Sequence, residues 1–190
     1  MNEKLFIPII LATNKKDRKT ENVAKLLLEE MEERKGIETM LFDVKDFKFP
    51  QDNYGQSIKD QFPEWRDAIV KADGLVIVTP EYNHGYPGPL KSALDLLLPE
   101  YKHKAVGLVG VSMSPWGGTR VIENLLPVMR ELGLVTSSAS LNVPRVQELF
   151  DEQGNLNDEA YKERISSFLD ELAWMAQALR WGRENNKSEK

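Results

Sequence analysis

The chemistry that the sequence suggests first is anion binding by the segment at residues 12–20, which reads ATNKKDRKT. Two hydroxyls and several cations stand there directly before a stretch with helical periodicity. The first N–H groups of a helix lack partners within the helix, and the helix dipole is positive at that end, so such a segment favours a phosphate. The alternative is an ordinary solvated loop in which Thr20 caps the helix. Neither GxGxxG nor GxxxxGK[ST] occurs here, which favours a small ligand with one phosphate.

Two further segments combine stiff backbone with polar and aromatic side chains. Residues 79–91 contain three prolines and two glycines, with Tyr82, Asn83 and His84 between them. Residues 112–119 read SMSPWGGT, and their paired glycines allow backbone to approach a ligand closely. Trp116 either stacks on a ligand or covers the edge of the core.

These three segments follow apolar runs that are typical of strands. Such runs occur at residues 5–12, 37–43, 74–79, 105–112 and 135–142, with helical patterns between them. The alternation predicts one α/β domain with a five-stranded parallel sheet covered by helices on both faces. Strand order 2-1-3-4-5, the flavodoxin-like three-layer sandwich, is the commonest arrangement at this length. It brings the three segments together at the carboxyl ends of the strands.

The helical patterns predict helices over residues 20–31, 63–72, 87–98 and 119–132, and a last helix from Tyr161 to about Leu179. We expect the domain to cover residues 1–182. Residues 183–190 are rich in charge, and we expect them to form a frayed tail.

The segment at residues 80–95, PEYNHGYPGPLKSALD, resembles the PEYN-x-x-x-PG-x-LKN-x-x-D signature of the NADPH-dependent FMN reductase family. This family comprises flavodoxin-like quinone and azo reductases. Residues 12–20 are similar to the family's GSxRxxRxS phosphate segment, and residues 150–159 are similar to its stretch after the fifth strand. The likeness extends over about residues 5–180.

The resemblance implies an enzyme that transfers hydride from NADPH or NADH through bound FMN to a quinone, an azo compound, free flavin or a similar acceptor. Such chemistry needs no catalytic side chain, because the cofactor accepts the hydride. The FMN phosphate would be held by Thr13, Lys15, Arg18 and Thr20. The flavin ring would be held by backbone around Pro80, Glu81, Tyr82 and Asn83, and by the segment that contains Ser112, Ser114, Trp116, Gly117 and Gly118. The helix N-terminus near Gly118 would stabilise the reduced ring.

Three other functions compete with this one. A non-enzymatic flavin electron carrier or flavin-binding regulator would need a partner reductase, and the TxTGxT loop typical of flavodoxins is missing. A serine hydrolase is suggested by Gly110-Val111-Ser112-Met113-Ser114, which fails the GxSxG pattern at its last position and leaves only His84 and His103 as bases. A metal site would have only these two histidines, without a ligand motif.

The composition limits the kinds of chemistry and of binding partner that the chain can have. The 190 residues carry a net charge of −5 and no cysteine, so thiol nucleophiles and disulfides are excluded and nucleic acid is an improbable partner. No apolar run approaches the ~20 residues of a membrane span, and no signal peptide is evident. We predict a cytoplasmic protein without membrane contact. The resemblance implies a homodimer or homotetramer, with the second subunit near the flavin.

Overall fold

The centre of the molecule is a pair of fully buried parallel strands, β5 (Gly74–Pro80) and β6 (Ala105–Val111). The computed structural model describes residues 3–50 and 52–186. On one side of this pair lie β2 (Ile9–Leu11) and then β4 (Leu41–Asp43). On the other side β6 pairs with both β7 (Val135–Thr136) and β8 (Leu141–Val143). All pairings are parallel, and the predicted order 2-1-3-4-5 is confirmed.

Three of the five apolar runs do not form continuous strands, so the prediction of one strand per run was wrong for them. The first is divided into β1 (Leu5–Phe6) and β2, the second into β3 (Ile37–Glu38) and β4, and the fifth into β7 and β8. Pro8 stands at the division of the first run and has no N–H to donate to a ladder. Consequently β1 pairs only with β3, as a separate two-stranded ribbon.

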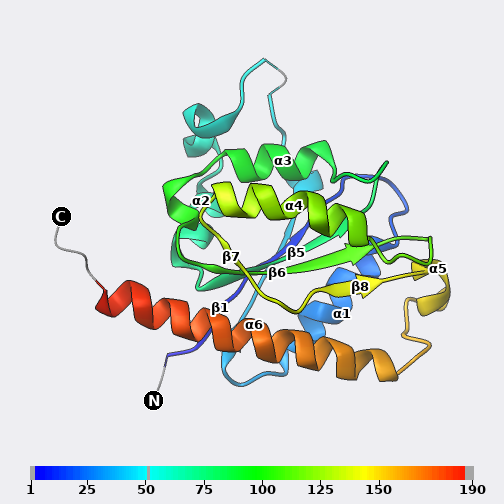
Figure 1. Ribbon diagram of the computed structural model, residues 1–190. Helices are drawn as coiled ribbons and strands as arrows, with labels where there is room; N and C mark the ends of the chain where they lie inside the picture. The colour runs from blue at the N-terminus through cyan, green and yellow to red at the C-terminus, as the bar shows by residue number, and fades with distance from the viewer. Residues whose placement is uncertain (1–2, 51, 187–190) are drawn as a thin grey trace.

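Helices cover both faces of the sheet (Figure 1), and each face carries its own apolar core. One core joins α1 (Thr20–Glu32) and the long α6 (Ala160–Asn185) to the sheet. The other joins α2 (Pro63–Lys71), α3 (Gly88–Asp95) and α4 (Thr119–Glu131) to it. Shorter segments connect these elements: the 3-10 turns η1 (Val44–Asp46), η2 (Gly55–Gln61) and η3 (Pro99–Tyr101), and the single-turn α5 (Val146–Leu149).

Two predicted helix ends were wrong. Helix α3 ends at Asp95 rather than near Leu98, because Leu98 precedes Pro99 and takes a non-helical backbone conformation. Helix α6 continues past Gly182 to Asn185, so residues 183–185 do not belong to a frayed tail. Residues 187–190 of that expected tail lie outside the described residues.

A buried carboxylate binds the last turns of α6. Asp73 accepts a hydrogen bond from the backbone N–H of Phe6 at 3.1 Å and pairs with Arg183 at 2.7 Å and Arg180 at 3.4 Å. Arg183 also donates to the carbonyl of His103 at 2.7 Å. The end of the last helix is therefore tied to the first strand. In residues 3–50 and 52–186, no helix is both long enough and apolar enough to cross a membrane.

We predict that Gly118→Ala destabilises the protein by at least about 2 kcal/mol, since the Cβ would lie 2.7 Å from backbone atoms of Gly110 and Val111 and φ is +73°. The matched control is Gly182→Ala in α6, where no heavy atom lies within 4 Å of the added Cβ. That change should stabilise the helix by about 0.5–1 kcal/mol. Urea unfolding of both variants measures the change in the free energy of unfolding. Equal changes in the two variants would contradict the close packing of Gly118 on Gly110 and Val111.

Candidate functional site

The segments after β2, β5 and β6 converge on a hollow of about 420 Å³, as the strand order predicts. We call it the inner hollow. Its walls come from the segment before α1, from the end of β5 and from the segment after β6. They are formed by Lys15, Asp17, Arg18, Lys19, Thr20, Pro80, Glu81, Tyr82, Val111, Ser112, Met113, Ser114 and Val146.

Arg18 is buried, and its guanidinium is held by the protein itself. It forms a two-pronged ion pair with Asp43 at the end of β4, donates to the carbonyl of Thr13 and lies 3.3 Å from Glu21. The acidic partners Asp43 and Glu21 make this burial possible, because an arginine can be buried only when its charge is compensated.

The ion pair also sets the protonation of Asp43. Burial acts to raise the pKa of its carboxyl, but hydrogen bonds from Arg18 and from the backbone and side chain of Lys45 outweigh burial and lower the pKa. Asp43 therefore remains ionised when the chain is folded. It fixes Arg18, and with it the segment before α1, to the sheet.

Thr20 is not the N-cap of α1. The cap position belongs to Lys19, without a side-chain hydrogen bond, and Thr20 lies buried in the first turn, where it contributes to the hollow. The backbone N–H groups of Lys16, Asp17 and Lys19 make no hydrogen bond within the described residues. Lys15 and Lys19 likewise form no ion pair there. This wall thus offers free donors and positive charge to an anion.

The segment after β5 forms a tight turn. Tyr82 and Gly85 exchange two backbone hydrogen bonds of 2.9 Å, and Asn83 and His84 between them both adopt left-handed backbone conformations. The Tyr82 hydroxyl lies 2.9 Å from the Thr13 hydroxyl. This contact joins the segment after β5 to the segment after β2.

Glu81 points to α4. Its Oε2 accepts hydrogen bonds from the backbone N–H groups of Arg120 at 3.2 Å and Val121 at 3.4 Å. A carboxylate of the chain therefore already occupies these two donors, which are not available to a reduced flavin. That the helix N-terminus near Gly118 stabilises the reduced ring stays a prediction.

The segment after β6 is shaped by close backbone contact. Gly117 and Gly118 both have left-handed conformations, and Gly118 packs directly on Gly110. The Ser112 hydroxyl lies 3.0 Å from the Ser114 hydroxyl and donates to the Ser114 carbonyl at 3.1 Å. No histidine side chain within the described residues forms a hydrogen bond with Ser112. The nucleophile and base pair that a serine hydrolase needs is not formed.

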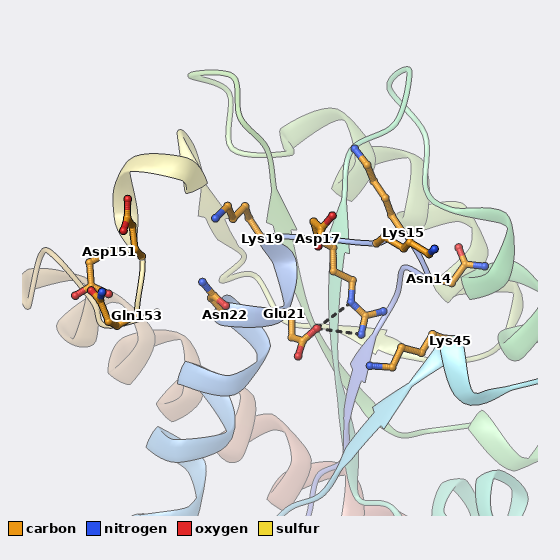
Figure 2. A pocket seen from close by; sticks show the side chains of 13 residues that line it. Asn14, Lys15, Asp17, Lys19, Glu21, Asn22, Lys45, Asp151 and Gln153 are labelled. Carbon is orange, nitrogen blue, oxygen red and sulfur yellow. Dashed lines mark hydrogen bonds and ion pairs between the residues drawn. The ribbon is translucent and has the colours of Figure 1, made fainter.

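A second hollow of about 610 Å³ lies on the outer side of the segment before α1 (Figure 2). Figure 2 shows Lys19 and Asn22 between the segment that carries Asp151 and Gln153 and the side of the hollow formed by Lys15 and Lys45. Lysines and carboxylates are mixed in this outer hollow, and Lys45 is paired with Asp43. Lys15 and Lys19 contribute to both hollows, whereas Lys16 lines only the outer one.

The inner hollow gathers most of the predicted site residues. Lys15, Arg18, Thr20, Pro80, Glu81, Tyr82, Ser112 and Ser114 line it, while Thr13, Asn83, Trp116, Gly117 and Gly118 lie outside its lining. Five more residues line it and were missed: Asp17, Lys19, Val111, Met113 and Val146. The first four stand beside predicted residues and could have been found, but Val146 follows a turn that no motif marks. Among the described residues, no group of three or more acidic or histidine side chains could hold a metal ion.

We predict that Arg18→Ala lowers the free energy of unfolding by about 1.5–3 kcal/mol, because it removes the two-pronged partner of the partly buried Asp43 carboxylate and leaves it with Lys45 alone. The folded-state pKa of Asp43 is lowered, so this carboxylate stabilises the fold above its unfolded pKa of about 3.9. The stabilisation is lost as the pH falls through the folded-state pKa. The stability difference between the parent protein and Asp43→Asn should therefore be constant from about pH 8 to 5 and shrink below about pH 4.

Denaturant unfolding across this pH range measures both effects. Arg18→Lys is the conservative control, since it keeps the charge and loses the two-pronged geometry. If Arg18→Ala unfolds at the denaturant concentration of the parent protein, the ion pair does not carry the stability assigned to it.

Known proteins resemble this chain in sequence and in structure. Residues 7–148 match the family described as NADPH-dependent FMN reductase. An NAD(P)H-dependent FMN reductase of Pseudomonas aeruginosa is 30% identical over 155 residues, which are 76% of this chain and 82% of that protein. An FMN-dependent NADPH-azoreductase of Staphylococcus aureus is 28% identical over 179 residues, 86% of this chain and 91% of that protein.

The fold has a known counterpart as well. The flavoenzyme NAD(P)H:(acceptor) oxidoreductase FerB from Paracoccus denitrificans superposes with a TM-score of 0.76 at 23% identity, over 92% of this chain and 98% of that one. The inner hollow lies where such α/β sheets bind ligands, at the carboxyl ends of the strands. Its free amides and lysines suit a phosphate, and its strand ends suit a planar ring. The chain belongs to the NADPH-dependent FMN reductase family and is an oxidoreductase that uses FMN, with NAD(P)H as electron donor.

Proposed function

We propose that the chain reduces small planar acceptors, namely quinones, azo compounds or free flavin, with FMN held in the inner hollow. The observation that carries this proposal is the wall before α1. There, unpartnered backbone N–H groups stand beside Lys15 and Lys19. Arg18 also lines this wall, but its charge is already compensated by Asp43. A relative from Burkholderia named 2-hydroxy-1,4-benzoquinone reductase, 30% identical over 130 residues, supports a quinone as acceptor.

In this proposal the phosphate contacts Lys15, Lys19 and the backbone before α1, together with the Thr20 hydroxyl. Arg18 and Thr13 act indirectly: Arg18 ties this wall to Asp43, and Thr13 ties it to Tyr82. The ring would lie against backbone at Pro80–Tyr82 and at the segment from Ser112 to Ser114. Gly117 and Gly118 shape that segment from behind, by packing on Gly110 and on residues 142–144.

Bound FMN supplies two-electron chemistry, so that NAD(P)H, one proton and a quinone yield NAD(P)⁺ and a hydroquinone. The tasks of the chain are to bind, to orient and to leave one side of the site open to two successive reactants. None of the described side chains at the hollow has to attack a substrate. The hydroxyls of Ser112 and Ser114 form a hydrogen bond with each other and can also form hydrogen bonds with a bound ligand.

We expect Lys15→Gln to weaken FMN binding by about 10-fold, the lower end of the range for a charge-assisted hydrogen bond because the side chain is exposed. Lys16→Gln is the matched control: it removes the same charge one residue away, from a side chain that lines only the outer hollow. Titration of each apoprotein with FMN, followed by flavin fluorescence, gives the two affinities. Equal losses of FMN affinity in the two variants would mean that the phosphate does not bind in the inner hollow. FAD, whose second phosphate has no place in this assignment, should bind more weakly than FMN.

We expect steady-state rates at several fixed quinone concentrations to give parallel double-reciprocal lines, because one open side serves NAD(P)H and acceptor in turn. Ser112→Ala and Ser114→Ala should keep turnover within about an order of magnitude, since neither hydroxyl attacks substrate. Anaerobic titration of the FMN-loaded protein with NADPH, then with quinone, should bleach and restore the flavin absorbance. A flavin that NADPH reduces only with an added reductase would instead identify an electron carrier.

Assembly and location complete the proposal. We propose a homodimer or homotetramer in the cytoplasm, whose partners are small molecules and not nucleic acid. The exposed surface at the turn Tyr82–Gly85 and along α3 is the surface we favour for the contact between subunits. Sedimentation velocity of the FMN-loaded protein measures the assembly directly.

A further inference from the structure

A large aromatic side chain stands exposed beside the inner hollow. Trp116 keeps 61% of its surface accessible, and the Arg120 guanidinium carbon lies 5.7 Å from the centre of its ring. This separation is within the range of a cation–π contact. Met113, in the wall of the hollow itself, is 68% exposed. Large apolar groups gathered at the edge of a cavity mark a surface that a ligand covers.

The backbone that carries Trp116 is fixed, although its side chain is exposed. The Trp116 carbonyl accepts hydrogen bonds from the Thr119 backbone N–H at 3.2 Å and from the Thr119 hydroxyl at 2.6 Å. Gly117 and Gly118 follow in left-handed conformations, each wedged against other backbone. The indole is thus presented to solvent from a rigid base, which lowers the entropy lost when a ring stacks on it.

Single hydrogen bonds connect this pair of residues to the walls of the hollow. The backbone N–H of Trp116 donates to the Ser114 hydroxyl at 3.4 Å, and the backbone N–H of Arg120 donates to Glu81 at 3.2 Å. Ser114 and Glu81 both line the inner hollow. Trp116 and Arg120 therefore border the site, just outside its lining.

The charge of Arg120 remains available there. Its side chain is 48% exposed and makes no hydrogen bond within the described residues, and its nearest carboxylate oxygen, Oε1 of Glu81, is 3.9 Å away. The other oxygen of Glu81 is used by the N-terminus of α4. The edge of the site thus combines an electron-rich ring with a positive charge that is only partly neutralised.

We propose that Trp116 and Arg120 determine which acceptor is reduced. The indole favours extended, electron-poor aromatic acceptors by stacking, and the guanidinium favours those that carry an anionic group such as a sulfonate or carboxylate. The inference rests on the proposed function and names the class of electron acceptor that the site prefers. An aromatic ring pair contributes enough for a preference of about 2- to 12-fold, and an exposed charge pair enough for about 2- to 5-fold.

The test compares three acceptors with the FMN-loaded full chain: 1,4-benzoquinone, 1,4-naphthoquinone and 1,4-naphthoquinone-2-sulfonate. Trp116→Ala should lower kcat/KM for both naphthoquinones by about 3- to 10-fold and for benzoquinone by less, because the smaller ring stacks over less area. Arg120→Gln should lower kcat/KM by about 2- to 5-fold for the sulfonate alone, and this loss should vanish in about 0.5 M salt.

Trp174→Ala is the control for loss of an exposed tryptophan, since Trp174 is 69% exposed on α6 and does not line the inner hollow. It should leave all three values unchanged. Two results would overturn the inference while quinone reduction itself stands. One is an equal loss of kcat/KM for the three quinones in Trp116→Ala. The other is a loss of kcat/KM in Arg120→Gln that is the same with and without the sulfonate group. If Trp116→Ala changes the sedimentation coefficient and not the selectivity, Trp116 is an assembly residue and the inference is wrong. If the parent protein reduces none of the quinones, the proposed function fails instead.

Discussion

The site depends on the compensation of one buried positive charge. Arg18 lies between the end of β2 and α1, and without Asp43 and Glu21 its guanidinium could not be buried there. Because Asp43 ends β4, the ion pair fixes the segment before α1 to the neighbouring strand. That segment is the wall shared by the inner and outer hollows. The ion pair therefore holds in place a wall that carries the free N–H groups of Lys16, Asp17 and Lys19.

A second internal carboxylate governs the other side of the site. Glu81 leaves the end of β5 and takes two N–H donors at the start of α4, which links the segment after β5 to the segment after β6. Each of the three segments at the strand ends is therefore tied to a neighbouring element: by Arg18 with Asp43, by Tyr82 with Thr13, and by Glu81 with α4. Polar contacts with defined geometry, rather than apolar packing alone, hold the site open and in register.

The sheet and most of the residues that line the inner hollow could be predicted because their signals are local. Runs such as residues 74–79 are apolar throughout, which indicates a strand covered on both faces, and the segment at residues 80–95 is long enough to identify the family. The role of Arg18 could not be predicted, because Asp43 is 25 residues away in sequence and only the sheet brings the two together. The same holds for Glu81 and α4, which lie about 40 residues apart. The division of the first strand could have been predicted, since Pro8 stands within it. The continuous apolar character of residues 5–12 led us to predict one strand instead.

The carboxylate of Asp73 constrains the order in which the chain can be completed. It joins the N–H of Phe6 to Arg180 and Arg183, so one corner of the sheet needs contributions from nearly both ends of the sequence. A protein that emerges from the ribosome N-terminus first can form its central βαβ units early, whereas this corner must wait until residue 183 has left the exit tunnel. Contacts that close such long loops also form late in refolding. Until then, the Asp73 carboxylate that binds the N–H of Phe6 lacks both of its arginine partners, and β1 lacks its connection to the last helix.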